Sequence, residues 1–207
     1  MSLNTCRRCG TCCRKGGPAL HLSDAGLLEH FPMGSLVCLR RGEMAFDPRA
    51  NGLGPLENEL LKIRGRDGGW ACMYFEEENT ACVVYMHRPL ECRTLSCADT
   101  GDILCAMDTP TLAREHVVPA GSALRACIEE HERLFPAGKA VGLAAARRAG
   151  DGIPKELDSL IRREAHFRQS FAEKVGTTDE DLWAYFGRPL WLVLAPLNRG
   201  YMQYGLR

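Results

Sequence analysis

Cysteine placement constrains this chain more than any other feature of its sequence. Eleven of the 207 residues are cysteine, and ten of these precede residue 106. Four fall close together near the N-terminus, as Cys6, Cys9, Cys12 and Cys13. Two-residue gaps let successive thiolates converge on one centre, and Gly10 permits the tight backbone turn that this needs. The run therefore predicts a metal site, in which either Cys12 or Cys13 completes the first centre while the other reaches a neighbouring centre or a partner group.

The redox compartment decides how such cysteines are used. The chain begins Met-Ser-Leu-Asn-Thr-Cys, without the basic and apolar regions of a secretory signal. It also has no apolar run of about 18 residues, so we expect a cytoplasmic protein that does not span a membrane. Reducing buffers keep cytoplasmic thiols unpaired, so a dense cysteine pattern there indicates metal binding or catalysis rather than a disulfide framework.

The charge balance excludes two broad classes of partner. Lys and Arg total 26, as do Asp and Glu, so the formal net charge is zero. Such a chain lacks the long-range field expected of a general nucleic-acid or anionic-membrane binder. Hydrophobic residues at 45% and charged residues at 25% are ordinary for a globular protein, so we expect one large core or two small ones.

A second set of cysteines follows about 60 residues later and bears on which metal is bound. It has no two-residue knuckle of the kind that paired zinc ribbons present. By contrast, the spacing of Cys6, Cys9 and Cys12 matches the first three ligands of a bacterial ferredoxin run, although the continuation to Cys-Pro is absent. An iron–sulfur cluster, such as a 4Fe–4S cluster, is therefore favoured, and zinc stays open. The candidate metal ligands are Cys6, Cys9, Cys12, Cys13, Cys72, Cys82, Cys92 and Cys97.

Cys92 has the clearest local reason to be a ligand. It follows Arg88-Pro89, and a proline in the first turn of a helix would place Cys92 one turn in, with its side chain fixed in direction. The remaining thiols Cys38, Cys105 and Cys127 lie among apolar residues, which predicts small buried hydrophobes. Thiol–disulfide exchange at Cys9-Gly-Thr-Cys12 is disfavoured, because no strand precedes it.

Few other side chains suggest chemistry. His87 is the one histidine inside the second cysteine set; it would ligate metal or hydrogen-bond a ligand there, but such a residue is more often just a partly exposed ring. Carboxylate groups in the chain fit helix first turns and solvated faces, and this applies to Asp24, Glu29, Asp179, Glu180 and Asp181. No P-loop, dinucleotide fingerprint or nucleophile elbow is present.

Hydrophobic periodicity predicts an α+β fold in which a small irregular Cys-rich sheet holds the metal and a helical C-terminal layer covers it. The expected strands are 59–64, 70–75 and 81–85, with a turn at Asp67-Gly68-Gly69 between the first two. Expected helices, the first capped by Ser23, cover 23–31, 90–97, 101–107, 122–135, 138–149, 154–175 and 179–186. We expect a metal-binding domain at 1–105 and a helical extension at 106–207 packed on it.

The cysteine motifs resemble the YkgJ-like CxxCxxCC family of zinc- or iron-chelating domains. The resemblance covers about residues 4–97 and includes Leu22-Ser23-x-x-Gly26, Cys72-x-Tyr74-Phe75, Cys82-x-Val84-Tyr85 and Arg88-Pro89-x-x-Cys92-Arg93 besides the N-terminal run. It implies metal ligation by Cys6, Cys9, Cys12, Cys13, Cys72, Cys82 and Cys92. It implies no particular reaction.

Three classes of function remain open at this point. The leading one is a metal-binding protein. The second is a metal-dependent enzyme of methyl-transfer type, because the flagellin lysine methylase distantly resembles this chain in its cysteine pattern. The third is an interaction module that uses metal only for folding. The aromatic C-terminal segment would either bind a protein partner or pack the helical layer against the sheet. Its aromatic residues are Trp183, Tyr185, Phe186, Trp191, Tyr201 and Tyr204.

Overall fold

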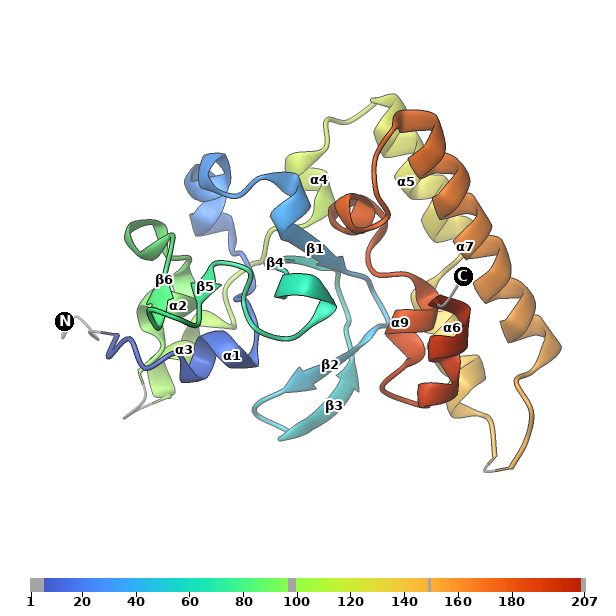
Figure 1. The fold of residues 1–207 in the computed structure, drawn as a ribbon, viewed down its shortest axis with the longest axis horizontal. Coiled ribbons are helices and arrows are strands. Elements are labelled where there is room, and N and C mark those ends of the chain that lie inside the picture. The colour runs from blue at the N-terminus through green and yellow to red at the C-terminus, as the bar shows by residue number, and fades with distance from the viewer. Residues whose placement is uncertain (1–5, 97–99, 149, 206–207) are drawn as a thin grey trace. The chain divides into compact units, whose positions relative to one another are not determined.

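The fold is α+β, as the periodicity predicts (Figure 1). The structure is a computed structural model, and it describes residues 6–96, 100–148 and 150–205. The chain divides into two compact units. Unit 1 comprises Met1–Val37 and Leu60–His116, and unit 2 comprises Cys38–Glu59 and Val117–Arg207. None of the helices formed by the described residues is long and apolar enough to cross a membrane.

Strands in the described residues form three separate two-stranded sheets rather than the single sheet expected from the sequence. Strand β1 (Leu36–Leu39) pairs with β4 (Leu60–Ile63), and β5 (Phe75–Glu76) pairs antiparallel with β6 (Ala81–Cys82). The predicted strand at 59–64 is therefore confirmed as β4. The predicted strand at 70–75 is wrong over most of its length, because Cys72 only bridges Gly65 and then turns, its carbonyl accepting from the Phe75 N–H at 2.9 Å.

A small core holds unit 1 together. Three extended segments exchange backbone hydrogen bonds: the Leu20 N–H donates to Leu61 O at 2.9 Å, Leu61 to Leu112 at 2.8 Å, and Leu112 back to Leu20 at 2.7 Å. All three leucines are buried, and Phe31 and Ile63 are buried with them. Residues 41 to 92 positions apart in the sequence are thus fixed side by side, which gives the irregular loops a rigid base.

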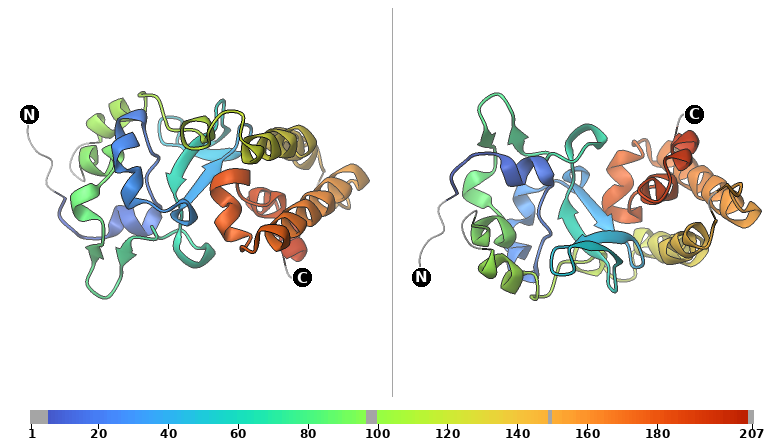
Figure 2. Two further views of the ribbon diagram at one scale, coloured as in Figure 1. Left: turned by 90° about the horizontal axis from the view of Figure 1, so that it is seen from above. Right: turned by 90° about the horizontal axis from the view of Figure 1, so that it is seen from below.

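The helices of unit 1 are short. The main ones are α1 (Thr11–Lys15), a 3₁₀ helix (Leu22–His30), α2 (Leu90–Thr94), α3 (Gly101–Ala106) and α4 (Arg114–Val117). Three-residue 3₁₀ helices also occur at Met33–Ser35, Arg66–Gly68 and Tyr85–His87. Figure 2 shows α1 in blue near the green segment of α2 and α3. The helix expected at 23–31 is present as the 3₁₀ helix, but its capping box is formed by His21 and Asp24 and not by Ser23. The helix expected at 90–97 is present as α2 but ends earlier than predicted, at Thr94, because the backbone of Leu95 is extended; residue 97 lies outside the described residues.

Unit 2 joins a hairpin from the first half of the chain to the helices of the second half. Strands β2 (Met44–Asp47) and β3 (Gly52–Pro55) pair antiparallel, with Met44 opposite Pro55. The sequence analysis did not predict this hairpin. Its helices are α5 (Ala123–Leu134), α6 (Ala137–Ala145), α7 (Lys155–Val175), α8 (Trp183–Phe186) and α9 (Leu190–Leu194). The first four confirm predicted helices, and α9 was not predicted.

The C-terminal aromatic side chains pack within unit 2. Trp183, Phe186 and Tyr201 are buried, and Trp191 and Tyr204 pack half-buried against a core that includes Phe135, Leu157, Ile161, Leu190 and Leu194. The helix α7 supplies much of this core, through the apolar stripe expected of an amphipathic helix. A role of these aromatics toward a protein partner stays a prediction.

A buried ionic network crosses unit 2, and the sequence analysis did not foresee it. Arg40, Glu43, His131, Glu164 and Arg168 are each no more than 2% exposed. Arg168 Nη1 lies 3.3 Å and His131 Nε2 3.4 Å from the Glu164 carboxylate, and Arg40 Nη1 donates to Phe135 O at 3.1 Å. Burial by itself would raise the pKa of Glu164, but Arg168, His131 and Arg40 outweigh it and hold that pKa below its ordinary value.

The contacts of segment 38–59 allow a prediction of how the chain responds to limited proteolysis. Besides pairing with each other, Arg40 and Glu43 have partners between residues 131 and 188, including Arg188, whose Nη2 donates to Glu43 at 2.8 Å. A fragment ending near residue 120 would leave both side chains without these partners. We therefore expect proteolysis to yield no stable fragment of that length, as mass spectrometry of the digest would show. A clean, metal-loaded fragment ending there would contradict this prediction.

Candidate metal centre

The N-terminal cysteines lie on a loop that closes against Phe75. Gly10, at φ 73°, precedes α1, so Cys12 and Cys13 fall in the first turn of that helix. A Cβ at Gly10 would lie 2.4 Å from Cζ of Phe75, closer than any side chain tolerates. This confirms that the run needs a glycine between Cys9 and Cys12, both for its positive φ and for its close approach to the β5 strand.

Backbone contacts bring Cys72 and Cys82 to the same place. The Cys72 N–H donates to the Cys13 carbonyl at 2.7 Å, which joins the second cysteine set directly to the first. In the β5–β6 hairpin, Cys82 lies opposite Phe75, the residue whose N–H closes the turn after Cys72. Cysteines separated by ten residues in the sequence are therefore neighbours around one hairpin.

Cys92 is positioned by the start of α2. Pro89 occupies the N-cap position of that helix, one residue before the predicted place, and Cys92 is the third helical residue. A carboxylate of the 3₁₀ helix Leu22–His30 holds α2 in place: buried Asp24 accepts from the Leu90 N–H at 2.9 Å and from Arg93 Nη2 at 3.3 Å. The neighbouring Glu91 accepts from the Ala19 N–H at 2.8 Å. The direction of the Cys92 side chain therefore depends on two buried or half-buried carboxylates.

Six of the eight candidate ligands act on one another electrostatically. Burial raises the pKa of the Cys13 thiol to about 12, with further contributions from Cys12, Cys72 and Cys82. Burial likewise raises the pKa of Cys72, Cys82 and Cys92, and thiols of the same set add to each shift. One thiolate repels the next, so these couplings show that the thiols share one neighbourhood. Its members are Cys6, Cys12, Cys13, Cys72, Cys82 and Cys92.

Cationic side chains surround this neighbourhood. Arg88 lowers the pKa of Cys82 and Lys62 lowers that of Cys72, each against the larger effect of burial. The guanidinium groups of Arg8 and Arg88 lie 4.2 and 3.9 Å from the ring centroid of Tyr85. Such cations favour thiolates, and stacking on Tyr85 holds two of them in position.

Arg14 links the N-terminal cysteine loop to Glu77, in the β5–β6 hairpin. Its guanidinium makes a bidentate pair with Glu77, Nε and Nη2 each donating at 2.8 Å, while its Nη1 donates to the Cys9 carbonyl at 3.1 Å. It interacts electrostatically with Cys9 and Cys13. Cys9 itself is exposed, and its thiol donates to Thr11 Oγ1 at 3.4 Å.

Other predicted positions lie apart from this group. Cys38 is fully buried and Cys127 packs half-buried against the core of unit 2, as expected of small hydrophobes. Cys105 is exposed, so its predicted burial is wrong; its helix α3 turns that side chain outward. His87 is also exposed, and its ring stacks on His30 with centroids 3.5 Å apart. Cys97 lies outside the described residues.

Geometry and chemistry together define what the group can do. Thiolates are the donors that suit zinc and iron–sulfur clusters, so the residues fit either group. Among residues 6–96, 100–148 and 150–205, no three His, Cys, Asp or Glu side chains are arranged as they are around a bound metal ion. The described cysteines are all free of disulfides. The thiols are thus gathered in one neighbourhood, and burial there raises the pKa of Cys13, Cys72, Cys82 and Cys92.

Asp24 is the functional residue that the sequence analysis misjudged. It was expected in a helix first turn or on a solvated face; it does lie in the first turn of the 3₁₀ helix, yet it is fully buried and accepts hydrogen bonds from residues 90 and 93. One Asp24 oxygen accepts from the Leu90 N–H and the other from the His21 N–H, so Asp24→Asn must turn its amide N–H toward one of these two donors. We expect this to cost about 2 kcal/mol of stability in unit 1, together with a roughly tenfold or greater loss of metal affinity. Urea unfolding and metal titration check this.

The matched control for Asp24→Asn is Glu29→Gln on the same 3₁₀ helix. Glu29 is exposed, with its side chain 77% accessible, so both measurements should stay near those of the parent chain. Equal effects of the two substitutions would show that Asp24 does not position α2.

Comparison with known proteins agrees with the cysteine geometry. A protein-family model, CxxCxxCC, matches residues 5–109 and is described as "Putative zinc- or iron-chelating domain". The match spans about half of the chain and includes each described cysteine of the group above. No curated protein and no solved structure matches the chain significantly. On the family match, this chain belongs to the CxxCxxCC family of zinc- or iron-chelating domains.

Proposed function

We propose that unit 1 is a metal-binding domain that holds an iron–sulfur cluster or zinc through its clustered cysteines. The observation that carries the proposal is that six thiols from three separate stretches of chain interact around one hairpin. Their proposed role is metal ligation, and Cys9 and Cys97 belong to the same proposed set. Such a convergence has no use in the core of a small apolar domain, where cysteines occur singly.

The raised thiol pKa values support this function. Thiols that resist ionisation, as those of Cys13, Cys72, Cys82 and Cys92 do, are poor nucleophiles at neutral pH, which disfavours thiol–disulfide exchange at these four positions. A bound metal cation shifts the equilibrium from thiol to thiolate, because it deprotonates coordinating thiols outright. The proposed site therefore loads by releasing protons as its thiols turn toward a common centre, and a reducing compartment such as the cytoplasm keeps them available.

Iron–sulfur is our preferred occupant. The spacing of Cys6, Cys9 and Cys12 is that of a ferredoxin run, and the second set lacks a zinc knuckle. Nearby cations do not decide between the two, because four thiolates around either group carry the same formal charge. Arg8, Arg88 and Lys62 offset that charge in both cases.

Anaerobic isolation of the full chain tests the proposal. We expect iron with acid-labile sulfide, measured by elemental and sulfide analysis together with the visible absorption of the cluster. Stoichiometric zinc without sulfide would contradict the preference for iron but support metal binding. A chain isolated without metal, and unable to take up iron or zinc after reduction, would contradict the function itself.

A further inference from the structure

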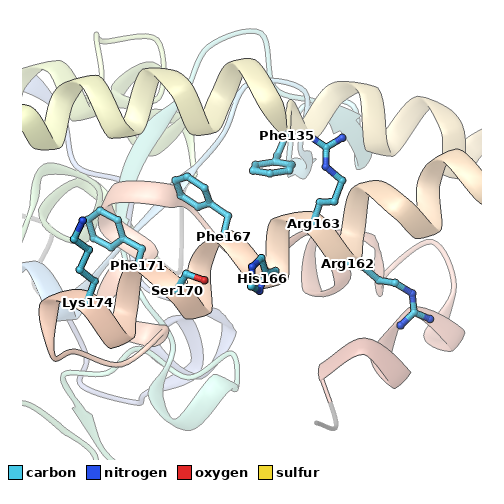
Figure 3. A pocket seen from close by; sticks show the side chains of 8 residues that line it. All are labelled: Phe135, Arg162, Arg163, His166, Phe167, Ser170, Phe171 and Lys174. Carbon is cyan, nitrogen blue, oxygen red and sulfur yellow. The ribbon is translucent and has the colours of Figure 1, made fainter.

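A groove on unit 2 lies far in the sequence from the cysteine site and has a different chemistry (Figure 3). It is an open groove of about 590 Å³ that follows one face of α7 for about 18 Å, from Arg162 to Lys174, and Phe135 at the C-terminal end of α5 also lines it. Its lining residues are Phe135, Arg162, Arg163, His166, Phe167, Ser170, Phe171 and Lys174. The set combines three aromatic rings with three cations and contains no carboxylate.

The aromatic floor of the groove is fixed in place. The ring of Phe167 lies 5.7 Å from that of Phe135, edge to face, and 6.4 Å from that of Phe171, nearly parallel to it. Beneath the floor, the ring of buried His131 is 5.3 Å from Phe167, and His131 belongs to the ionic network of unit 2. The apolar surface is therefore preformed, which lowers the entropic cost of binding a ligand.

The cations of the groove differ in whether they are neutralised. Arg162 is paired with Asp158, its Nε lying 3.0 Å from the carboxylate. Arg163 and Lys174 have no such partner among the described residues; the guanidinium of Arg163 lies 5.9 Å from the centroid of Phe135. Figure 3 shows Arg163 and Lys174 at opposite ends of the aromatic row. The groove thus presents two uncompensated positive charges beside an apolar floor.

We propose that this groove binds an anionic amphipathic small molecule, an aryl or acyl acid. Its apolar body lies on Phe167 and Phe171, and its acid group meets Arg163 or Lys174. The volume is within the range of small-molecule sites, whereas a standard protein interface presents about 20–30 residues on each side, far more than the eight that line this groove. The chemistry of the lining therefore favours a small acid over a peptide.

The test is a fluorescence titration of the full chain with anilinonaphthalene sulfonate, compared with uncharged phenylnaphthylamine. We expect one saturable site for the sulfonate, with decanoate displacing it and decanol displacing it much less. Arg163→Gln combined with Lys174→Gln should weaken sulfonate binding about tenfold or more and leave the uncharged probe unchanged. Ser170→Trp, which fills the groove from an exposed position, should abolish both.

A matched control separates the groove from general charge. Lys155→Gln combined with Arg199→Gln removes two exposed positive charges from the same unit and should leave sulfonate affinity unchanged. Thermal melts of every variant check that unit 2 stays folded. The proposal fails if the parent chain shows no saturable sulfonate binding, if the control pair weakens it equally, or if a folded Ser170→Trp variant still binds. Displacement by acidic peptides but not by decanoate would assign the groove to a protein partner instead.

Discussion

Cys92→Ala is expected to remove most of the metal from the anaerobically isolated chain and to destabilise unit 1 by several kcal/mol. The binding free energy of a structural metal is folding free energy, about 10 kcal/mol or more in small metal domains, so losing a fixed ligand is costly. The position of Cys92 is fixed by the start of α2 and by the hydrogen bond of Asp24 to the Leu90 N–H. Metal analysis and chemical unfolding measure the two effects.

Cys127→Ala is the matched control for that experiment. Cys127 packs half-buried against the apolar cluster of α5, α7 and α8 in unit 2, where it contributes only a small volume. Its replacement should keep full metal loading and cost about 1 kcal/mol. Equal metal content in the two variants, or a loss of metal confined to Cys127→Ala, would overturn the assignment of Cys92 as a ligand.

Glu164→Gln should destabilise unit 2 by about 3–5 kcal/mol, the range typical of breaking a buried ion pair. The Glu164 carboxylate is fully buried and lies against Arg168, His131 and the Leu190 N–H. An amide in its place would leave Arg168 buried beside no full negative charge at that position. Denaturant unfolding followed by tryptophan fluorescence reports mainly on this unit, because Trp183 and Trp191 belong to it, whereas Trp70 of unit 1 is already 73% exposed in the folded chain.

Glu173→Gln provides the comparison on the same helix. Glu173 is exposed and only accepts a hydrogen bond from Gln169, so its substitution should change stability by less than about 0.5 kcal/mol. Metal content should be unchanged in both variants, because the proposed ligands belong to unit 1. Similar stability losses in both variants would show that the buried network contributes nothing special.

Much of the local structure follows from the sequence alone. The helices α5, α6 and α7 lie where apolar residues recur at three- and four-residue spacing, and Ser122 caps α5 by accepting from the Arg125 N–H. Periodicity and capping act between residues a few positions apart, so they can be read without a partner. The cysteine spacing acts in the same way, since neighbouring thiols converge through a short loop.

Charged residues within the apolar stripe of α7 show the limit of prediction from local sequence patterns. Glu164 and Arg168 fall on the buried side of α7, in line with Leu157, Leu160 and Ile161. Their place in the apolar stripe shows that these charges face inward, and this is the one feature of the sequence that indicates a buried ionic network. It does not show that their partners are Arg40 and His131, because those come from distant segments.

The sequence by itself determined that cysteines dominate this protein, that metal is the chemistry they suit, and where its longer helices lie. Tertiary structure alone decided that strand 60–63 pairs with 36–39, that Asp24 is buried under α2, and that Cys105 faces outward. The physical reason is separation along the chain. Pairing between segments that are tens of residues apart depends on which surfaces the whole fold buries, and no local spacing carries that information.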